Sequence, residues 1–197
     1  MKRKSPDATL EKWLNLKKAK VEVKGGITFV ECKSAGYPAR TKVNVQETDA
    51  TLLLAVDVNT PGEKLTRRYC LENKKPYLVV KIDDKTNKTD KTTEDVAAWV
   101  KSNQIKRLNI AGNCLTRFRA EITQKQLDDL VTGLLTGLDL EHVQTGGQTG
   151  MDQAGTMAAL SLKIPAKVVA PRGWMFREQS GRDVISEELF KSRFNST

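Results

Sequence analysis

The stretch VQTGGQTGMDQAGTMAAL, residues 143–160, joins a β-like run to a helix-like run through a glycine-rich turn. A flexible linker would require only Gly and Ser, whereas this turn also contains Thr, Gln and Asp. A glycine turn that follows a strand and opens a helix would direct free N–H groups at a ligand beyond the strand's carboxyl end. The spacing matches neither the G-x-G-x-x-G fingerprint nor the Walker A lysine motif. Two interpretations therefore stay open, an anion or nucleotide site and a tight structural turn.

Apolar runs alternate with helix-like windows along most of the remaining chain. Short apolar segments bounded by Gly, Pro, Asn or charge are typical of buried strands, and the alternation predicts a mostly parallel α/β sheet covered by helices. The expected strands are residues 27–32, 50–58, 76–82, 107–112, 141–146 and 166–171. The expected helices are residues 62–73, 93–103, 122–137 and 151–162, with a weaker window at 183–193, and the polar stretch 83–95 is expected to be an exposed loop.

The composition indicates one sizeable folded unit, because the 197 residues are 39% hydrophobic. We expect a single domain over residues 26–197 after a basic N-terminal tail, residues 1–25. The sequence contains neither an 18-residue apolar run nor a secretory signal. We therefore expect an intracellular protein, cytoplasmic or nuclear, that does not associate with a membrane. The three cysteines are far apart, and the single histidine, His142, suggests a structural role, so no metal site is predicted.

The segment GGQTGMDQAGTMAALSLKIP, residues 146–165, followed by VVAPRGW, residues 168–174, closely resembles the start of the putative molybdenum carrier family. That family belongs to the SLOG superfamily of Rossmann-like nucleotide-binding domains. Here these segments come last, and the part that normally follows them, beginning FVECKSAGYPARTKVNVQETDATLLLAV at residue 29, comes first. The chain is therefore identified as a circularly permuted member, with a Rossmann-like mostly parallel sheet and helices on both faces.

The resemblance implies a cleft that binds a nucleotide or nucleotide-derived phosphorylated ligand. Matched by motif, the candidate ligand-binding residues are Gly146, Gly147, Gln148, Thr149, Gly150 and Asp152 from the glycine turn, Pro171, Arg172 and Gly173 after the next strand, and Arg40, Thr41, Asn44, Asp49, Thr60 and Gly62 from the front half. Two departures stand out. Residues 59–62 replace the usual Gly-Gly-Thr turn, and Asn113 with Cys114 replaces a Pro-Arg pair, which removes a cationic contact.

Several of these side chains have a second interpretation. Asp152 would either grip a ribose hydroxyl or complement the helix dipole, Asp49 would cap a strand, and Arg40 would pair with Glu47. Some superfamily relatives cleave N-glycosidic bonds, which requires a carboxylate, and Asp152, Asp49 or Glu63 would supply it. Whether the protein is an enzyme stays open, no cofactor is assigned, and neither a thiolate nor a histidine cluster supports the molybdenum label.

The N-terminal tail carries much of the positive charge. Residues 1–24 contain eight Lys/Arg and three Asp/Glu, so they contribute +5 of the net +9. Leu10, Trp13 and Leu14 form a small apolar face at helical spacing, similar to a degenerate PIP box that docks on the replication sliding clamp. Asp7 replaces the usual glutamine, and Leu14 replaces an aromatic residue. Packing on the chain's own domain, another partner, nucleic acid binding and nuclear import remain open alternatives, as does oligomerisation.

Overall fold

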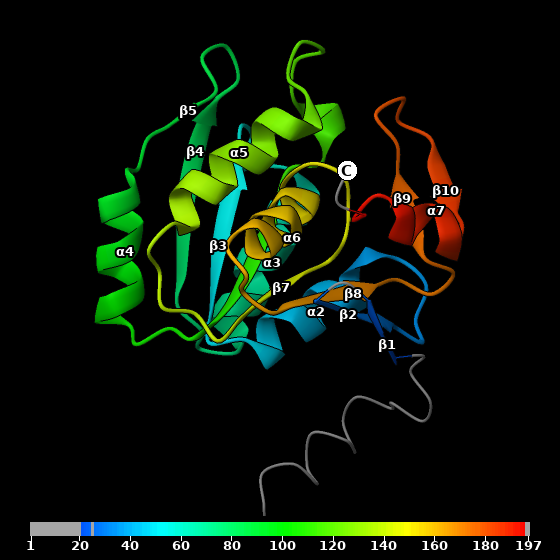
Figure 1. Cartoon of the computed structure of the whole chain (residues 1–197), viewed down its shortest axis with the longest axis horizontal. Coiled ribbons are helices and arrows are strands. Elements are labelled where there is room, and N and C mark those ends of the chain that lie inside the picture. Colours follow the sequence, from blue (N-terminus) through cyan, green and yellow to red (C-terminus); the bar gives the residue numbers. More distant parts are fainter. Residues whose placement is uncertain (1–20, 25, 196–197) are drawn as a thin grey trace, which may run out of the picture.

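The computed structural model describes residues 21–24 and 26–195 and is built on one eight-stranded sheet (Figure 1). In sheet order the strands are β1 (Val21–Lys24), β2 (Ile27–Glu31), β8 (Ala166–Ala170), β7 (His142–Thr145), β6 (Arg107–Gly112), β3 (Ala50–Ala55), β4 (Tyr77–Asp83) and β5 (Lys88–Thr89). The six central strands pair in parallel, and β1 and β5 pair antiparallel at the two edges. All six expected strands are present, and β7 lies inside the sheet between β8 and β6. The segment that comes late in the sequence is therefore a central strand.

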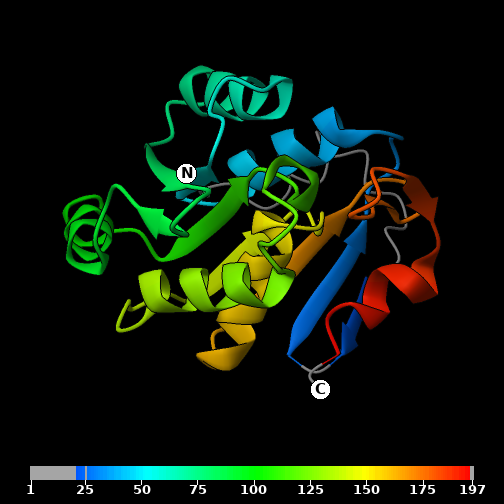
Figure 2. The same cartoon turned by 90° about the horizontal axis from the view of Figure 1, so that it is seen from above.

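Helices cover both faces of the sheet, which confirms the expected α/β class (Figure 2). On one face lie α2 (Tyr37–Glu47) and α3 (Pro61–Glu72), which contact each other. On the other face lie α5 (Gln124–Leu135) and α6 (Met151–Ser161), with α4 (Thr93–Ser102) packed against α5. None of the helices in the described part of the chain has the length and apolar character needed to cross a membrane.

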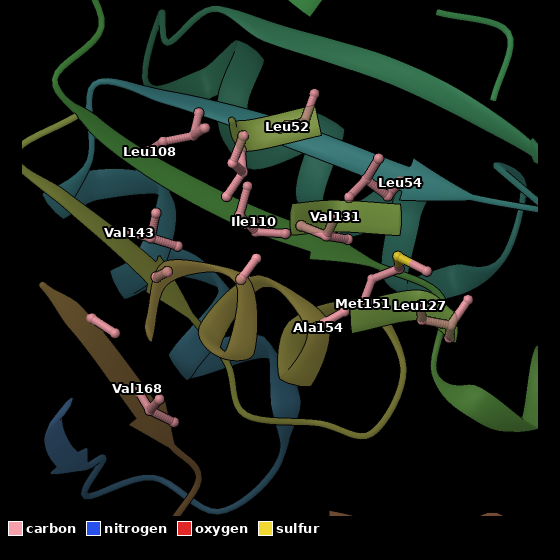
Figure 3. Close-up of a cluster of buried hydrophobic side chains, with 14 of the residues drawn as sticks. Leu52, Leu54, Leu108, Ile110, Leu127, Val131, Val143, Met151, Ala154 and Val168 are labelled. Atoms are coloured by element: carbon pink, nitrogen blue, oxygen red, sulfur yellow. The ribbon is translucent and has the colours of Figure 1, made fainter. Parts of the chain in front are cut away.

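The main core fills the space between the sheet and the pair α5 and α6 (Figure 3). Every residue of β3 is buried, as expected for a central parallel strand of sequence ATLLLA. Capping boxes start α4, at Thr92, and α5, at Thr123. Helix α6 approaches the sheet closely because Gly155 has no side chain: a Cβ there would lie 2.7 Å from the Cβ of Ile110.

Helix α2 is an α-helix that the sequence did not predict. Its periodicity is hidden, because the residues that it buries include the polar Arg40 and Asn44 as well as Val45. Pro38 also argues against a helix, but it stands in the first turn, where the missing N–H has no cost.

The C-terminal part differs from the expected single helix. Residues 171–195 form a hairpin of β9 (Met175–Arg177) and β10 (Asp183–Ile185), followed by the short helix α7 (Glu187–Ser192). Phe190 of α7 packs between Trp174 and Phe176, with ring centroids 5.5 and 6.0 Å away. These rings belong to the hydrophobic core. The stretch 83–95, expected to be a loop, contains the two-residue strand β5 and the first residues of α4.

Candidate functional site

A cleft of about 330 Å³ opens at the carboxyl ends of β3 and β6, flanked by α2 and α3. This edge is where parallel α/β sheets usually bind ligands. The residues that line the cleft are Tyr37, Arg40, Thr41, Asn44, Thr60, Pro61, Gly62, Glu63, Leu65, Thr66, Asn109, Ala111, Gly112, Asn113, Cys114, Arg117, Gln148, Asp152 and Arg177. Seven of them are candidates from the resemblance, namely Arg40, Thr41, Asn44, Thr60, Gly62, Gln148 and Asp152.

A buried ion pair joins α2 to the glycine turn at this cleft. The Arg40 Nη1 donates to Asp152 Oδ2 over 2.8 Å, and both side chains are buried. Burial raises the pKa of Asp152, whereas the Arg40 charge lowers it. A Cβ on Gly146 would lie 1.1 Å from Arg40 Nη1, so glycine at 146 is what lets the guanidinium reach the carboxylate. The alternative pairing of Arg40 with Glu47 is wrong, because Glu47 pairs with Lys167.

Four N–H groups of the glycine turn donate hydrogen bonds to other groups of the protein. Gly147 N–H donates to Thr145 Oγ1 (3.3 Å), and Gln148 N–H donates to Asp152 Oδ2 (3.3 Å). Gly150 N–H donates to the Gln124 side chain (2.7 Å), and Met151 N–H donates to the Asn113 carbonyl (3.1 Å). The expectation that these N–H groups are free to hold a phosphate is therefore wrong for these four. One of the four, the Gln148 N–H, already has an anionic acceptor in the Asp152 carboxylate.

The remaining residues of the turn attach it to the neighbouring hairpin. The Gln148 side chain accepts from Arg177 N–H (3.0 Å) and donates to the Met175 carbonyl (3.2 Å). Thr149 Oγ1 donates to the Arg177 carbonyl (2.8 Å). Gly146, Gly147, Thr149 and Gly150 are buried and do not line the cleft. They contribute to the site by holding Gln148 and Asp152 in position.

Asp49 and the pair Arg172 and Gly173 lie outside the cleft. Asp49 precedes β3, at the amino end of the sheet, where it accepts from Arg107 N–H (2.8 Å) and pairs with the Arg107 guanidinium. Strand polarity puts it at the edge opposite the cleft, so Asp49 is excluded as a cleft residue. At the carboxyl end of β8, Gly173 N–H donates to Glu31 Oε1 (2.6 Å), while the Arg172 side chain is exposed. Pro171 is buried and likewise outside the lining.

The cleft contains two arginines that the sequence did not single out, Arg117 and Arg177. Arg177 is held by a two-bond contact with Asp183, at 2.8 and 2.9 Å. Arg117 is exposed and forms no ion pair with any residue that the structure describes. Neither residue belongs to a motif of the family, so only their place in the fold identifies them.

Two buried acceptor oxygens in the cleft have no hydrogen-bond partner, Glu63 Oε2 and Asn109 Oδ1. Burial raises the pKa of Glu63, although its own N–H and the Asn113 side chain act in the opposite direction. Asn109 is 1% exposed, and its Nδ2 donates to Thr51 Oγ1 over 3.0 Å. A polar residue inside the apolar strand RLNIAG was the available signal for Asn109. Buried polar atoms are nearly always bonded, so both oxygens are available to accept from a group that the described part of the chain does not supply.

Fold and cleft together define a Rossmann-like α/β protein with a ligand-sized cleft at the carboxyl edge of its sheet. The model of the circularly permutated YpsA SLOG family matches residues 5–131, more than half of the chain, so the chain belongs to this family. The family membership predicted from residues 146–174 and from the segment beginning at residue 29 is thereby confirmed, although the matched segment ends before the glycine turn.

Solved structures add a more limited comparison. The "Putative molybdenum carrier protein" from Syntrophus aciditrophicus SB is 31% identical, with 51% of this chain and 61% of that chain covered and a TM-score of 0.41. Two structures of the PLP-bound C–S lyase from Staphylococcus hominis were also matched. The sequence identity to this chain is 12% for the complex with the inhibitor L-cycloserine and 13% for the second structure. In both, 81% of this chain and 43% of that chain are covered, with a TM-score of 0.43. The chain thus covers less than two thirds of each of these proteins. No curated protein matches.

Proposed function

We propose that the cleft binds a nucleotide or a nucleotide-derived phosphorylated ligand. The observation that carries this proposal is the position of Arg117, a guanidinium in the cleft lining without an ion-pair partner in the described part of the chain. Arg40 and Arg177 also line the cleft, but each is paired with a carboxylate. A planar guanidinium suits phosphate, which it binds through two parallel hydrogen bonds.

The start of α3 supports an anion at the same place. Its N-cap residue, Thr60, makes no capping hydrogen bond through its side chain, and Pro61 and Gly62 follow in the first turn. A Cβ on Gly62 would meet only Thr60 Oγ1, at 3.9 Å, so the helix end is open to a ligand. A helix N-terminus attracts anions through its N–H groups and its dipole. The cleft volume lies at the lower end of the range for small-ligand pockets.

Arg117→Gln is therefore expected to weaken binding about tenfold or more, because it removes a charge-assisted hydrogen bond to phosphate. Calorimetric titration with nucleoside monophosphates, diphosphates and ADP-ribose would measure this. Inorganic phosphate and molybdate belong in the same series, since molybdate is a tetrahedral oxyanion that would use the same cationic side chains. Arg119→Gln is the matched control, because Arg119 pairs with Asp84 and does not line the cleft. Equal affinity in all three proteins would contradict the proposal.

A second candidate function is hydrolysis of the N-glycosidic bond of a nucleotide, and Glu63 favours it. Among the three carboxylates that the sequence suggested, Asp49 lies at the opposite end of the sheet and Asp152 is engaged by Arg40. Glu63 lines the cleft with Oε2 unpartnered, and burial raises its pKa, which is the direction that favours a general acid.

If the protein is such a hydrolase, Glu63→Gln should reduce release of free base from nucleoside monophosphates by about a hundredfold or more. Chromatographic detection of the base would follow the reaction, and Glu72→Gln, on the exposed side of α3, is the control. Absence of base release by the wild-type protein would leave binding as the function.

We also propose that the basic N-terminal tail recruits a partner, with the sliding clamp as the first protein to test. Leu10, Trp13 and Leu14, which carry this proposal, lie outside the described residues. The variant Trp13→Ala with Leu14→Ala should lose retention on immobilised clamp, while its melting temperature stays that of the wild type. Leu16→Ala is the control. A fall of several degrees in the melting temperature would show instead that these side chains pack against the chain's own domain.

A further inference from the structure

Asn109 provides a rigid hydrogen-bond acceptor at the floor of the cleft. On β6 its neighbours Leu108 and Ile110 point into the hydrophobic core, whereas Asn109 and Ala111 face the cleft beneath α2 and α3. Asn109 is 1% exposed, so its side chain has little room to rotate.

The orientation of the Asn109 amide is fixed by a neighbour on β3. Asn109 Nδ2 donates to Thr51 Oγ1 over 3.0 Å. A threonine hydroxyl oxygen has lone pairs that accept from an amide N–H group. The amide nitrogen is therefore committed to Thr51, and Asn109 Oδ1 is the atom left without a partner.

Glu63 supplies a second acceptor from the α3 side of the same cleft. Its Oε2 is buried and has no hydrogen-bond partner, like Asn109 Oδ1. An unpaired buried acceptor is unfavourable, and a ligand that brings a donor removes that penalty. Two acceptors from different walls suit a ligand with two neighbouring donors. A vicinal diol has this property, whereas a deoxy sugar presents only one hydroxyl there.

We propose that the deep end of the cleft selects ribosyl over 2-deoxyribosyl ligands, with Asn109 Oδ1 as the specificity-determining acceptor and Glu63 Oε2 as its companion. This inference rests on the proposed function. In a 5′-nucleotide the ribose is attached directly to the phosphate, so a phosphate anchored by Arg117 and the start of α3 brings the sugar hydroxyls next to the cleft floor. Discrimination follows because the deoxy ligand leaves Asn109 Oδ1 unpaired.

The test compares ribose 5-phosphate with 2-deoxyribose 5-phosphate, and AMP with 2′-deoxy-AMP, by calorimetric titration. The wild-type protein is expected to bind each ribo ligand about tenfold or more tightly than its deoxy counterpart. Asn109→Leu, of similar volume, is expected to reduce that ratio to about twofold or less, with the affinity for the deoxy ligands nearly unchanged. Thr51→Val, which releases the amide without removing it, should give an intermediate ratio.

Asn103→Leu, at the exposed end of α4, is the matched control, and its ratio should equal that of the wild type. The comparison of ribo and deoxy ligands in the wild-type protein needs no variant, so it tests the preference for ribose even if Asn109→Leu fails to fold. Equal binding of ribo and deoxy ligands, or a preference that survives Asn109→Leu in a folded protein, would overturn this inference and leave the proposed function standing. If the wild-type protein binds none of the phosphorylated ligands, the proposed function fails and this inference fails with it.

Discussion

Gly146→Ala is expected to destabilise the folded protein by about 3–5 kcal/mol, because it breaks the buried ion pair at the cleft. The new Cβ would lie 1.1 Å from Arg40 Nη1 and 2.7 Å from Asp152 Oδ2. The guanidinium would have to leave, and Asp152, which is 4% exposed, would keep a buried charge without its partner. For a chain of this size the cost corresponds to a fall in melting temperature of roughly 6–20 °C.

Thermal and urea unfolding would measure this effect. Gly133→Ala, in the interior of α5, is the control, because its Cβ meets nothing within 4 Å and helix propensity predicts a gain of about 0.5–1 kcal/mol. A double variant tests the mechanism: Arg40→Ala removes the guanidinium, so adding Gly146→Ala should then cost little. Additive losses in the double variant would show that Gly146 acts through something other than Arg40.

The ion pair also explains why the sequence predicted the sheet better than the cleft. The strands are short apolar runs, and β6 and β7 match their expected segments closely, because burial on both faces leaves a local signal. The pair of Arg40 with Asp152 joins residues 112 positions apart, and no local pattern reports such a contact. Helix α2 was missed for the same reason, since its buried face is partly polar and only the tertiary contacts explain it.

The candidate residues from the resemblance show a related limit of prediction from sequence. A motif identifies the loop on which a residue lies, but strand polarity decides at which edge of the sheet that loop lies. Asp49 stands before β3 and thus at the wrong edge, whereas Thr60 and Gly62 follow the same strand and line the cleft. Arg117 and Asn109 were not among the candidate residues. That Arg117 is exposed and Asn109 is buried could be learned only from the folded structure.

Gly147→Val is expected to destabilise the protein by about 2–6 kcal/mol, through backbone strain and overpacking together. Gly147 has a φ of 71°, and a Cβ there would lie 2.3 Å from Phe190 Cζ and 2.7 Å from Val168 Cγ1. It is therefore packed against α7 and β8, and its carbonyl accepts from the partly buried Arg193 (2.7 Å). A fall in melting temperature of roughly 4–24 °C should follow.

Gly137→Val separates the two causes, because Gly137 has a φ of 79° but a Cβ there meets nothing within 4 Å. It should lose only the part due to backbone strain, about 1–3 kcal/mol. The comparison also decides what the glycine turn does. If Gly147 held a phosphate directly, Gly147→Val would abolish ligand binding while the melting temperature stayed near that of Gly137→Val. A larger thermal loss than in Gly137→Val means that the turn acts through packing, and that its effect on any ligand is transmitted by Gln148 and Asp152, the two residues of the turn that reach the cleft.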